Sequence, residues 1–134
     1  METKNKTLHI VLWIVQGLLA AMFLMAGIMK SFTPIEKLAE SLPWVKEYSP
    51  ALVRFIGISE LLGSLGLILP SLLKIKPQLT PLAALGFFII MVLAAVFHLM
   101  RAEYEALPVN VIIGALALFV AWGRYKKLPI QPKV

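Results

Sequence analysis

The sequence of 134 residues contains no cysteine, and only 15% of its side chains are charged. Without cysteine, the chain can form no disulfide, carry out no thiol redox chemistry and bind no metal through thiolates. Its two histidines are far apart in the sequence and leave little material for a metal site. Soluble domains carry about 25% charged residues, so the low charge excludes an ordinary soluble domain. With 60% hydrophobic residues, the composition indicates a membrane protein with several spans.

Four segments are apolar enough to cross, or nearly cross, a bilayer, which takes about 20 residues of helix. They cover about 8–29, 50–69, 80–100 and 107–122, and the last is the shortest. The first is too long for the apolar part of a signal peptide and lacks a clear cleavage site, so we interpret it as a span. The short connections predict an all-α polytopic membrane protein: a single domain over residues 1–134, built as a four-helix antiparallel transmembrane bundle.

Proline and hydroxyl residues mark the predicted helix boundaries. Ser49 and Thr80 each precede a proline, so we expect each hydroxyl to cap a helix that begins with that proline. Pro108 is expected to start the fourth helix, and Pro70 is expected to end the second.

The connection between the first two spans is too long for a simple turn. Its segment at about 34–42 has apolar residues on one face and predicts a short amphipathic helix. We expect Thr33 to cap this helix and Glu36 to complete a capping box. The helix should lie on the outer membrane interface as a lid, anchored by Trp44.

Positive charge is unevenly divided between the two sides of the predicted bundle. The side with both termini carries eight lysines and arginines, whereas the other carries four, offset by five glutamates. Because positive residues favour the cytoplasmic side, we expect a multi-pass protein of the bacterial cytoplasmic membrane with both termini in the cytoplasm. The net charge of +6 then reflects orientation and attraction to anionic inner-leaflet lipid, and it does not indicate nucleic-acid binding. The eight residues are Lys4, Lys6, Lys74, Lys76, Arg124, Lys126, Lys127 and Lys133.

Polar residues inside the spans carry the functional hypotheses. Counted at about 1.5 Å per residue from the outer boundary, Lys30 and His98 lie near the surface. Arg54 and Asn110 come about one turn deeper, and Glu60 lies roughly 14 Å down. All except Arg54 share faces with small residues, and such faces pack together in membranes. We therefore expect these groups to converge in the outer half of the bundle and to line a polar cavity that opens outward, partly covered by the lid.

Glu60 is the leading candidate for a ligand-binding group, because a carboxylate near the middle of a bilayer is unfavourable and usually functional. The alternative is a structural tie between helices through Lys30 or another polar neighbour. Lys30 is either the partner of Glu60 or a lysine that snorkels from the end of its helix.

The other polar residues also have structural alternatives. Arg54 lies on the apolar arc of its helix and is expected to snorkel to the headgroups. His98 could gate protons or bind a ligand, or it could pack and donate to a carbonyl. Asn110 could join helices by a hydrogen bond, and Gln16 is expected to do so. We predict no catalytic residue and no metal site.

Several of these segments match a known family. MAGIMKSF at the end of the first span, RFIGISELLGSLGLILP in the second, FHLM at the end of the third and the helical stripe that starts at Asn110 resemble the DoxX-like family of four-helix membrane proteins. The resemblance covers about residues 8–122. Its most specific part is the order Gly27, Lys30, Arg54, Gly57, Glu60, Gly63 and His98. The resemblance implies that the ligand-binding residues are Lys30, Arg54, Glu60, His98 and Asn110.

The resemblance implies a fold more sharply than a function. The family is named after subunits associated with thiosulfate:quinone oxidoreduction. The sequence is also similar to a branch that includes NACHO, an assembly chaperone of nicotinic receptors. We therefore expect a non-enzymatic accessory or chaperone protein, without a cofactor, that binds a lipid, a quinone-like amphiphile or a client transmembrane helix.

The alternative is a membrane subunit of a quinone-linked oxidoreductase complex. Glu60 and His98 would then relay protons, quinone would be a possible cofactor, and a partner protein would carry the electron centre. A small transporter is a third hypothesis, and it would need an oligomer, because the chain has four spans and no interrupted one. The sequence leaves the oligomeric state open.

Overall fold

The computed structural model describes residues 3–133, with side chains from residue 5 onward. Within this part the chain forms helices, turns and bends, and no strand, so the predicted all-α class is confirmed. The side chain of Lys4, one of the charges used to predict orientation, lies outside the described part. The elements are α1 (Thr3–Phe32), α2 (Ile35–Ser41), the 3₁₀ turn η1 (Pro43–Glu47), α3 (Pro50–Leu73), α4 (Leu79–Met100), the 3₁₀ turn η2 (Tyr104–Ala106), α5 (Leu107–Trp122) and the π-helical turn η3 (Gly123–Lys127).

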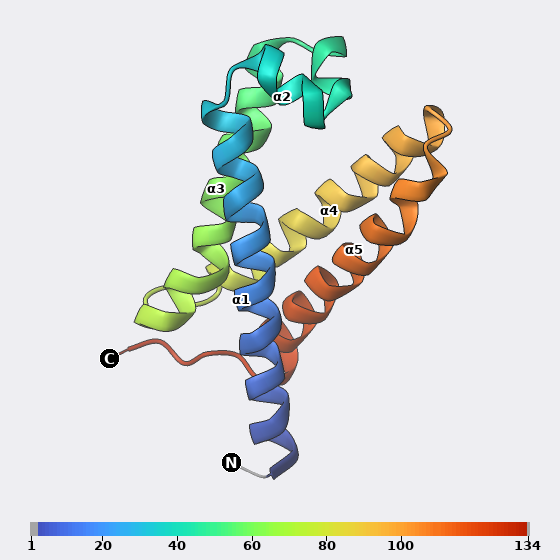
Figure 1. The fold of residues 1–134 in the computed structure, drawn as a ribbon. Helices are drawn as coiled ribbons and strands as arrows, with labels where there is room; N and C mark the ends of the chain where they lie inside the picture. The colour runs from blue at the N-terminus through green and yellow to red at the C-terminus, as the bar shows by residue number, and fades with distance from the viewer. Residues whose placement is uncertain (1–2, 134) are drawn as a thin grey trace.

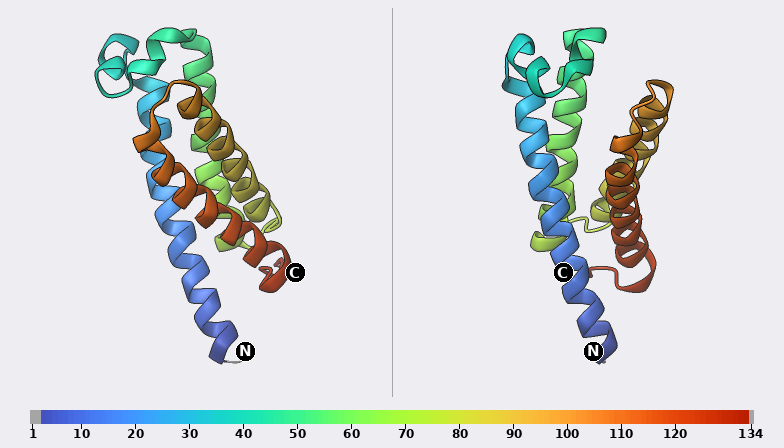
Figure 2. Two further views of the ribbon diagram at one scale, coloured as in Figure 1. Left: turned by 90° about the vertical axis from the view of Figure 1, so that its right-hand side faces the viewer. Right: turned by 45° about the vertical axis from the view of Figure 1, so that its right-hand side comes forward.

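The four predicted spans correspond to α1, α3, α4 and the helical stretch Tyr104–Lys127, in which η2 and η3 extend α5 at both ends. Each of the four is long and apolar enough to cross a membrane. They run up and down alternately and pack as two pairs, α1 with α3 and α4 with α5 (Figure 1). The pairs meet near the start of α1 and diverge toward α2 (Figure 2). We call α2 and η1 the lid, the end that carries them the lid end, and the opposite end, with residues 128–133, the tail end.

Two glycines allow α1 and α3 to touch backbone to backbone. A Cβ atom on Gly27 would lie 2.8 Å from the carbonyl oxygen of Gly57. A Cβ atom on Gly57 would lie 2.7 Å from the Cβ of Lys30. Small residues at a crossing are the usual way for transmembrane helices to pack closely. This crossing brings the last turns of α1 against the first half of α3, where the candidate residues lie.

The core that joins the two helix pairs lies between the middle of the molecule and the tail end. Phe23 of α1 stacks on Phe87 of α4 with 3.9 Å between ring centroids. The Phe87 ring occupies the space that a side chain at Gly63 would need, since a Cβ there would lie 2.5 Å from the ring. The other buried members are Val15, Leu19, Ala20, Leu67, Ala84, Ala117, Val120 and Ala121.

The connection between α3 and α4 corrects two predictions at once. Pro70 has no N–H to donate to the carbonyl of Gly66, four residues earlier. The Thr80 hydroxyl replaces that donor: it donates to the Gly66 oxygen at 2.9 Å and accepts from the Ser71 hydroxyl at 2.7 Å. The prediction that Pro70 ends the helix is therefore wrong, because α3 continues to Leu73. The prediction that Thr80 caps α4 is also wrong, because its hydroxyl is used between the helices and α4 begins before it.

Two other boundary predictions are confirmed. The Ser49 side chain accepts a hydrogen bond from the backbone N–H of Leu52 at 3.2 Å, and Pro50 is the first residue of α3. Pro108 lies in the first turn of α5, where its missing N–H leaves no unpaired carbonyl.

The lid contains the predicted short helix, but its start differs. Pro34 has an extended backbone, with φ −55° and ψ 140°, so it precedes α2 rather than beginning it, and no side chain caps the helix. The shift moves Glu36 out of the capping position, and the predicted capping box with Thr33 is wrong. The additional turn η1 was not predicted. Leu38 and Val45 fix the lid to the start of α3 by their burial there.

Candidate functional site

The centre of the candidate site is an ion pair between α1 and α3. The Nζ atom of Lys30 donates to Oε1 of Glu60 at 2.7 Å, and the two side chains are only 16% and 4% exposed. The Gly27–Gly57 crossing lies about one turn from both residues and holds them at this distance. Lys30 is therefore a partner of Glu60, which was one of its two predicted roles.

Arg54 lies beside this pair and binds the end of α1. Its Nη1 atom donates to the carbonyl oxygens of Lys30 at 2.9 Å and Thr33 at 2.7 Å. These carbonyls belong to the last turn of α1 and the residue after it, which have no partner within the helix, and a cation is favourable at this end of the helix dipole. The prediction that Arg54 snorkels to the headgroups is wrong. Most of the apolar arc on α3 stays exposed, with Ile58 and Leu62 among its exposed residues, but the Arg54 side chain reaches from it to the end of α1.

His98 and Asn110 lie on the other helix pair, and no hydrogen bond in the described part joins them to Glu60. The Nδ1 atom of His98 lies 3.0 Å from Oε1 of Glu103. Because an ionised carboxylate only accepts, this nitrogen carries the proton. The Nδ2 atom of Asn110 is buried without a hydrogen-bond partner among the described residues. The structure thus brings together Lys30, Arg54 and Glu60, and places His98 and Asn110 on the facing pair.

The loop after α4 is organised around Glu103. Its carboxylate accepts from His98 and, at 3.0 Å, from Nε of Arg101. The hydrogen bond from His98, followed by that from Arg101, lowers the pKa of Glu103 below its ordinary value of 4.5. Arg101 also pairs with Glu47 of the lid, and the two carboxylates raise its pKa.

An aromatic cluster adds to this link between the lid and α4. Trp44 and Tyr48 lie in and just after η1, and their rings are 6.2 Å and 5.8 Å from the ring of Phe97 in α4. The guanidinium carbon of Arg101 lies 5.2 Å from the centre of the Phe97 ring, a cation–π contact. The lid is therefore packed on α3 and attached to α4, and it spans the two helix pairs where they diverge.

The inward face of α4 becomes less buried from the tail end toward the lid end. Ala84 and Phe87 are buried near the tail end, whereas Met91, Ala94 and Ala95 are only partly buried toward the lid end. This change follows from the divergence of the two helix pairs (Figure 2). The predicted outward-opening cavity remains a prediction, and the two cavities described below lie at the tail end.

Arg124 is the residue that the sequence reasoning missed. It was counted among the tail charges, but it is 3% exposed and its Nε donates to Oε1 of Gln16 at 2.7 Å. Gln16 in turn donates to the carbonyl of Leu67 at 2.7 Å, which confirms its structural role. A polar Gln16 on the buried face of the first span was the sign that a polar partner had to lie opposite it.

In the described part of the chain, no group of three histidine or acidic side chains is placed to hold a metal ion. The comparisons add one finding. The sequence model of the DoxX-like family matches residues 14–120, which include all five candidate residues and most of the four spans. The search of curated proteins and the search of solved structures returned no match.

Proposed function

The chain belongs to the DoxX-like family and is an integral, multi-pass membrane protein, and from this premise we propose that it is a non-enzymatic accessory protein with a ligand site at its lid end. The ligand is embedded in the membrane: a lipid, a quinone-like amphiphile or a transmembrane helix of a client protein. The observation that carries this proposal is the buried Lys30–Glu60 pair, in the last turn of α1 and the first half of α3, near the end toward which the two helix pairs diverge (Figure 2). Charged residues at membrane depth are unfavourable and usually mark a binding or transport path.

Glu60 and Asn110 can each form a further hydrogen bond with a ligand. In the described part, the Glu60 carboxylate accepts one hydrogen bond, from Lys30 to Oε1, so its second oxygen can accept from a ligand hydroxyl or amide. The buried Nδ2 of Asn110 has no hydrogen-bond partner among residues 3–133 and can donate to a carbonyl. A buried donor left unpaired costs about 1–3 kcal/mol, which a ligand carbonyl would recover. Quinones, lipid esters and helix ends all present such carbonyls.

The lid is suited to controlling the access of a ligand to the space between the two helix pairs. It spans the two pairs through the aromatic cluster of Trp44, Tyr48 and Phe97 and through the pair of Glu47 with Arg101. Separation of the lid from α4 would open the space between the pairs without disturbing its packing on α3.

We further propose that the termini lie in the cytoplasm of a bacterial cell, which places the lid on the outer side of the cytoplasmic membrane. The division of positive charge supports this orientation. The similarity to the receptor-chaperone branch supports a client helix as one ligand class, and the family match does not select that branch.

Native mass spectrometry of the purified protein in a gentle detergent tests the proposal. We expect the wild type to retain an amphiphile or a client protein and the Glu60→Gln variant to lose it while still folding. Glu105→Gln is the matched control, because Glu105 is exposed at the same end and should leave retention unchanged. Unchanged retention in Glu60→Gln, together with a lower thermal stability, would show that the pair is only a structural tie. A retained quinone that the preparation reduces would instead support the oxidoreductase subunit.

A further inference from the structure

A second polar site lies at the tail end, around the buried guanidinium of Arg124. Its Nε donates to Gln16, and its Nη1 donates to the carbonyl of Leu128 at 3.0 Å and lies 3.0 Å from Nδ1 of His9. A guanidinium has no acceptor, so this His9 nitrogen must accept and is unprotonated. The guanidinium carbon also lies 5.5 Å from the centre of the Trp13 ring.

None of these partners carries a negative charge. The chain contains no aspartate, and its glutamates between residues 3 and 133 all fall within 36–60 or 103–105. Every ion pair of the described residues involves one of those glutamates, and none includes Arg124. The Nη2 atom is buried and has no hydrogen-bond partner in this part of the chain. A buried charge without a counterion is strongly unfavourable, and the described residues supply no anion for Arg124.

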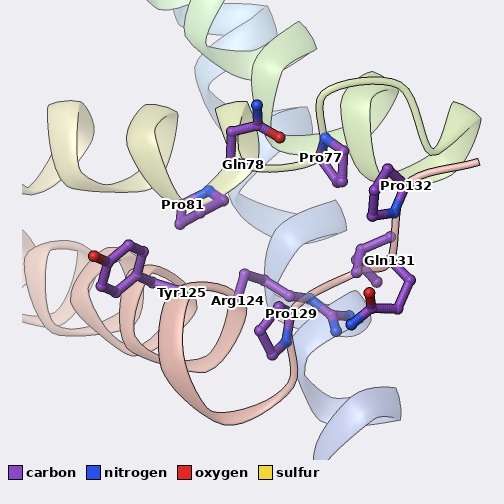
Figure 3. A pocket seen from close by; sticks show the side chains of 9 residues that line it. Pro77, Gln78, Pro81, Arg124, Tyr125, Pro129, Gln131 and Pro132 are labelled. Atoms are coloured by element: carbon purple, nitrogen blue, oxygen red, sulfur yellow. The ribbon is translucent and has the colours of Figure 1, made fainter.

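Two cavities lie at this end, one lined by Arg124 itself and one lined by its neighbours His9 and Trp13. Arg124 lines the smaller, of about 280 Å³, and its side chain points toward Pro129 and Gln131 of the tail (Figure 3). The larger, of about 490 Å³, is lined by His9, Trp13 and Lys74, among others. Residues 129–131 line both cavities. The tail is held across the α3–α4 turn by the backbone N–H of Lys133, which donates to the carbonyl of Lys74 at 2.8 Å.

The chemistry of these groups suits an oxyanion such as a phosphate. Of the guanidinium nitrogens, Nη2 has no partner among the described residues, and its two N–H groups can donate to phosphate oxygens. Lys74 adds a second cation at the larger cavity. The lining also includes the apolar Trp13, Leu72 and Ile130, which suit the glycerol and first acyl carbons of a lipid. Basic pockets at helix ends on the cytoplasmic side are sites where anionic lipid headgroups bind.

We propose that Arg124 and Lys74 bind the phosphate group of an anionic membrane lipid, with tail residues 129–131 as the cover of the site. The site is distinct from the one around Glu60, which lies toward the opposite end of the bundle. Residues 129–131 must move slightly to expose the Nη2 atom of Arg124 to the lipid. The hydrogen bonds that hold the tail are at its two ends, at Leu128 and Lys133.

The test titrates phosphatidylglycerol into the full-length protein in an uncharged detergent and follows the bound lipid by native mass spectrometry. Arg124→Lys keeps the charge and loses the planar donors, so it should weaken binding about tenfold, the effect of one hydrogen bond to a charged group. Lys74→Gln should weaken it about fivefold. The matched control is Lys76→Gln, in the same turn, also exposed and also at positive φ, but outside both cavities. It should change binding by less than about twofold.

Equal losses in Lys74→Gln and Lys76→Gln would show diffuse attraction to a basic surface and would overturn the proposal. So would phosphatidylcholine binding as tightly as phosphatidylglycerol, because that result would assign the site to acyl chains. Inorganic phosphate alone is the third arm: if it binds with the same dependence on Arg124 and Lys74, the occupant is free phosphate and the lipid is excluded. Because Lys74 is exposed, its variant should fold even if Arg124→Lys does not.

Discussion

Single residues decide how closely the helices of this protein approach. Gly57 is the clearest case, because a Cβ atom there would meet the Cβ and backbone carbon of Lys30 at 2.7 and 2.8 Å. Gly86, in α4, has no atom within 4 Å of the equivalent position. The same chemical change at these two glycines should therefore have opposite effects, although both lie inside apolar helices.

Gly57→Ala should destabilise the protein by about 1–3 kcal/mol, the usual effect of overpacking, since the backbones of α1 and α3 must separate. Gly86→Ala should instead stabilise it by about 0.5–1 kcal/mol through the lower backbone entropy of alanine. Thermal unfolding of both variants in one detergent measures the difference. If the two variants shift the melting temperature equally, the close crossing does not exist.

Glu103 gives a residue-scale dependence on pH. Hydrogen bonds from His98 and Arg101 depress its pKa in the folded protein below the ordinary 4.5. A carboxylate whose pKa is lower in the folded protein stabilises the fold at pH values above about 4.5. This contribution is lost as the pH falls through the pKa of the folded state. The melting temperature of the wild type should therefore exceed that of Glu103→Gln at neutral pH, and the gap should close in acid. A gap that stays constant down to pH values well below 4.5 would contradict this assignment.

At the scale of elements, the α3–α4 connection depends on one hydroxyl. Thr80 supplies the hydrogen bond that Pro70 cannot give to Gly66, and it also accepts from Ser71. Thr80→Val keeps the shape but leaves the Gly66 carbonyl and the Ser71 hydroxyl unpaired in a buried place. It should cost about 1–3 kcal/mol of stability. Thr80→Ser retains the hydroxyl and should recover most of this loss in the same unfolding experiment. Equal stability of the Val and Ser variants would mean that the hydroxyl contributes nothing.

The transmembrane helices and their connections differ in how far the sequence predicts them. The four spans and the inward faces of Gln16, Ala20 and Glu60 followed from hydrophobicity and helical spacing, which are local properties. The roles of Pro70 and Thr80 did not follow, because each depends on a residue in the other helix. Boundary rules for isolated helices treat proline as a stop and threonine as a cap, and they do not include a partner helix that supplies the missing donor.

The predicted surroundings of two arginines at the ends of spans were wrong for a similar reason. Arg54 faces an arc that is apolar within α3, and only the crossing at Gly57 brings the carbonyls of α1 over it. Arg124 precedes two lysines in a run typical of a solvated tail, but η3 continues α5 and turns its side chain toward Gln16. In contrast, pairing with Glu60 was one of the two roles that the sequence left open for Lys30, because both residues lie on small-residue faces that pack together.

At the scale of the whole molecule, orientation connects the two sites. If the termini are cytoplasmic, the site around Arg124 faces the inner leaflet, where anionic lipids attract basic segments, and the site around Glu60 lies toward the outer half of the membrane. The opposite orientation would remove the electrostatic argument for the lipid at Arg124. It would leave the argument for Glu60 unchanged, because burial at membrane depth does not depend on direction.

The absence of native cysteine allows this orientation to be measured without first removing a thiol. Glu105→Cys places a thiol at the lid end and Lys133→Cys places one in the tail, and both positions are exposed. With a membrane-impermeant maleimide on bacterial spheroplasts, we expect Glu105→Cys to be labelled before lysis and Lys133→Cys only after it, because the excess of lysine and arginine holds the tail end in the cytoplasm. The reverse pattern would place the lid in the cytoplasm, and labelling of both in intact spheroplasts would show that the chain inserts in two orientations.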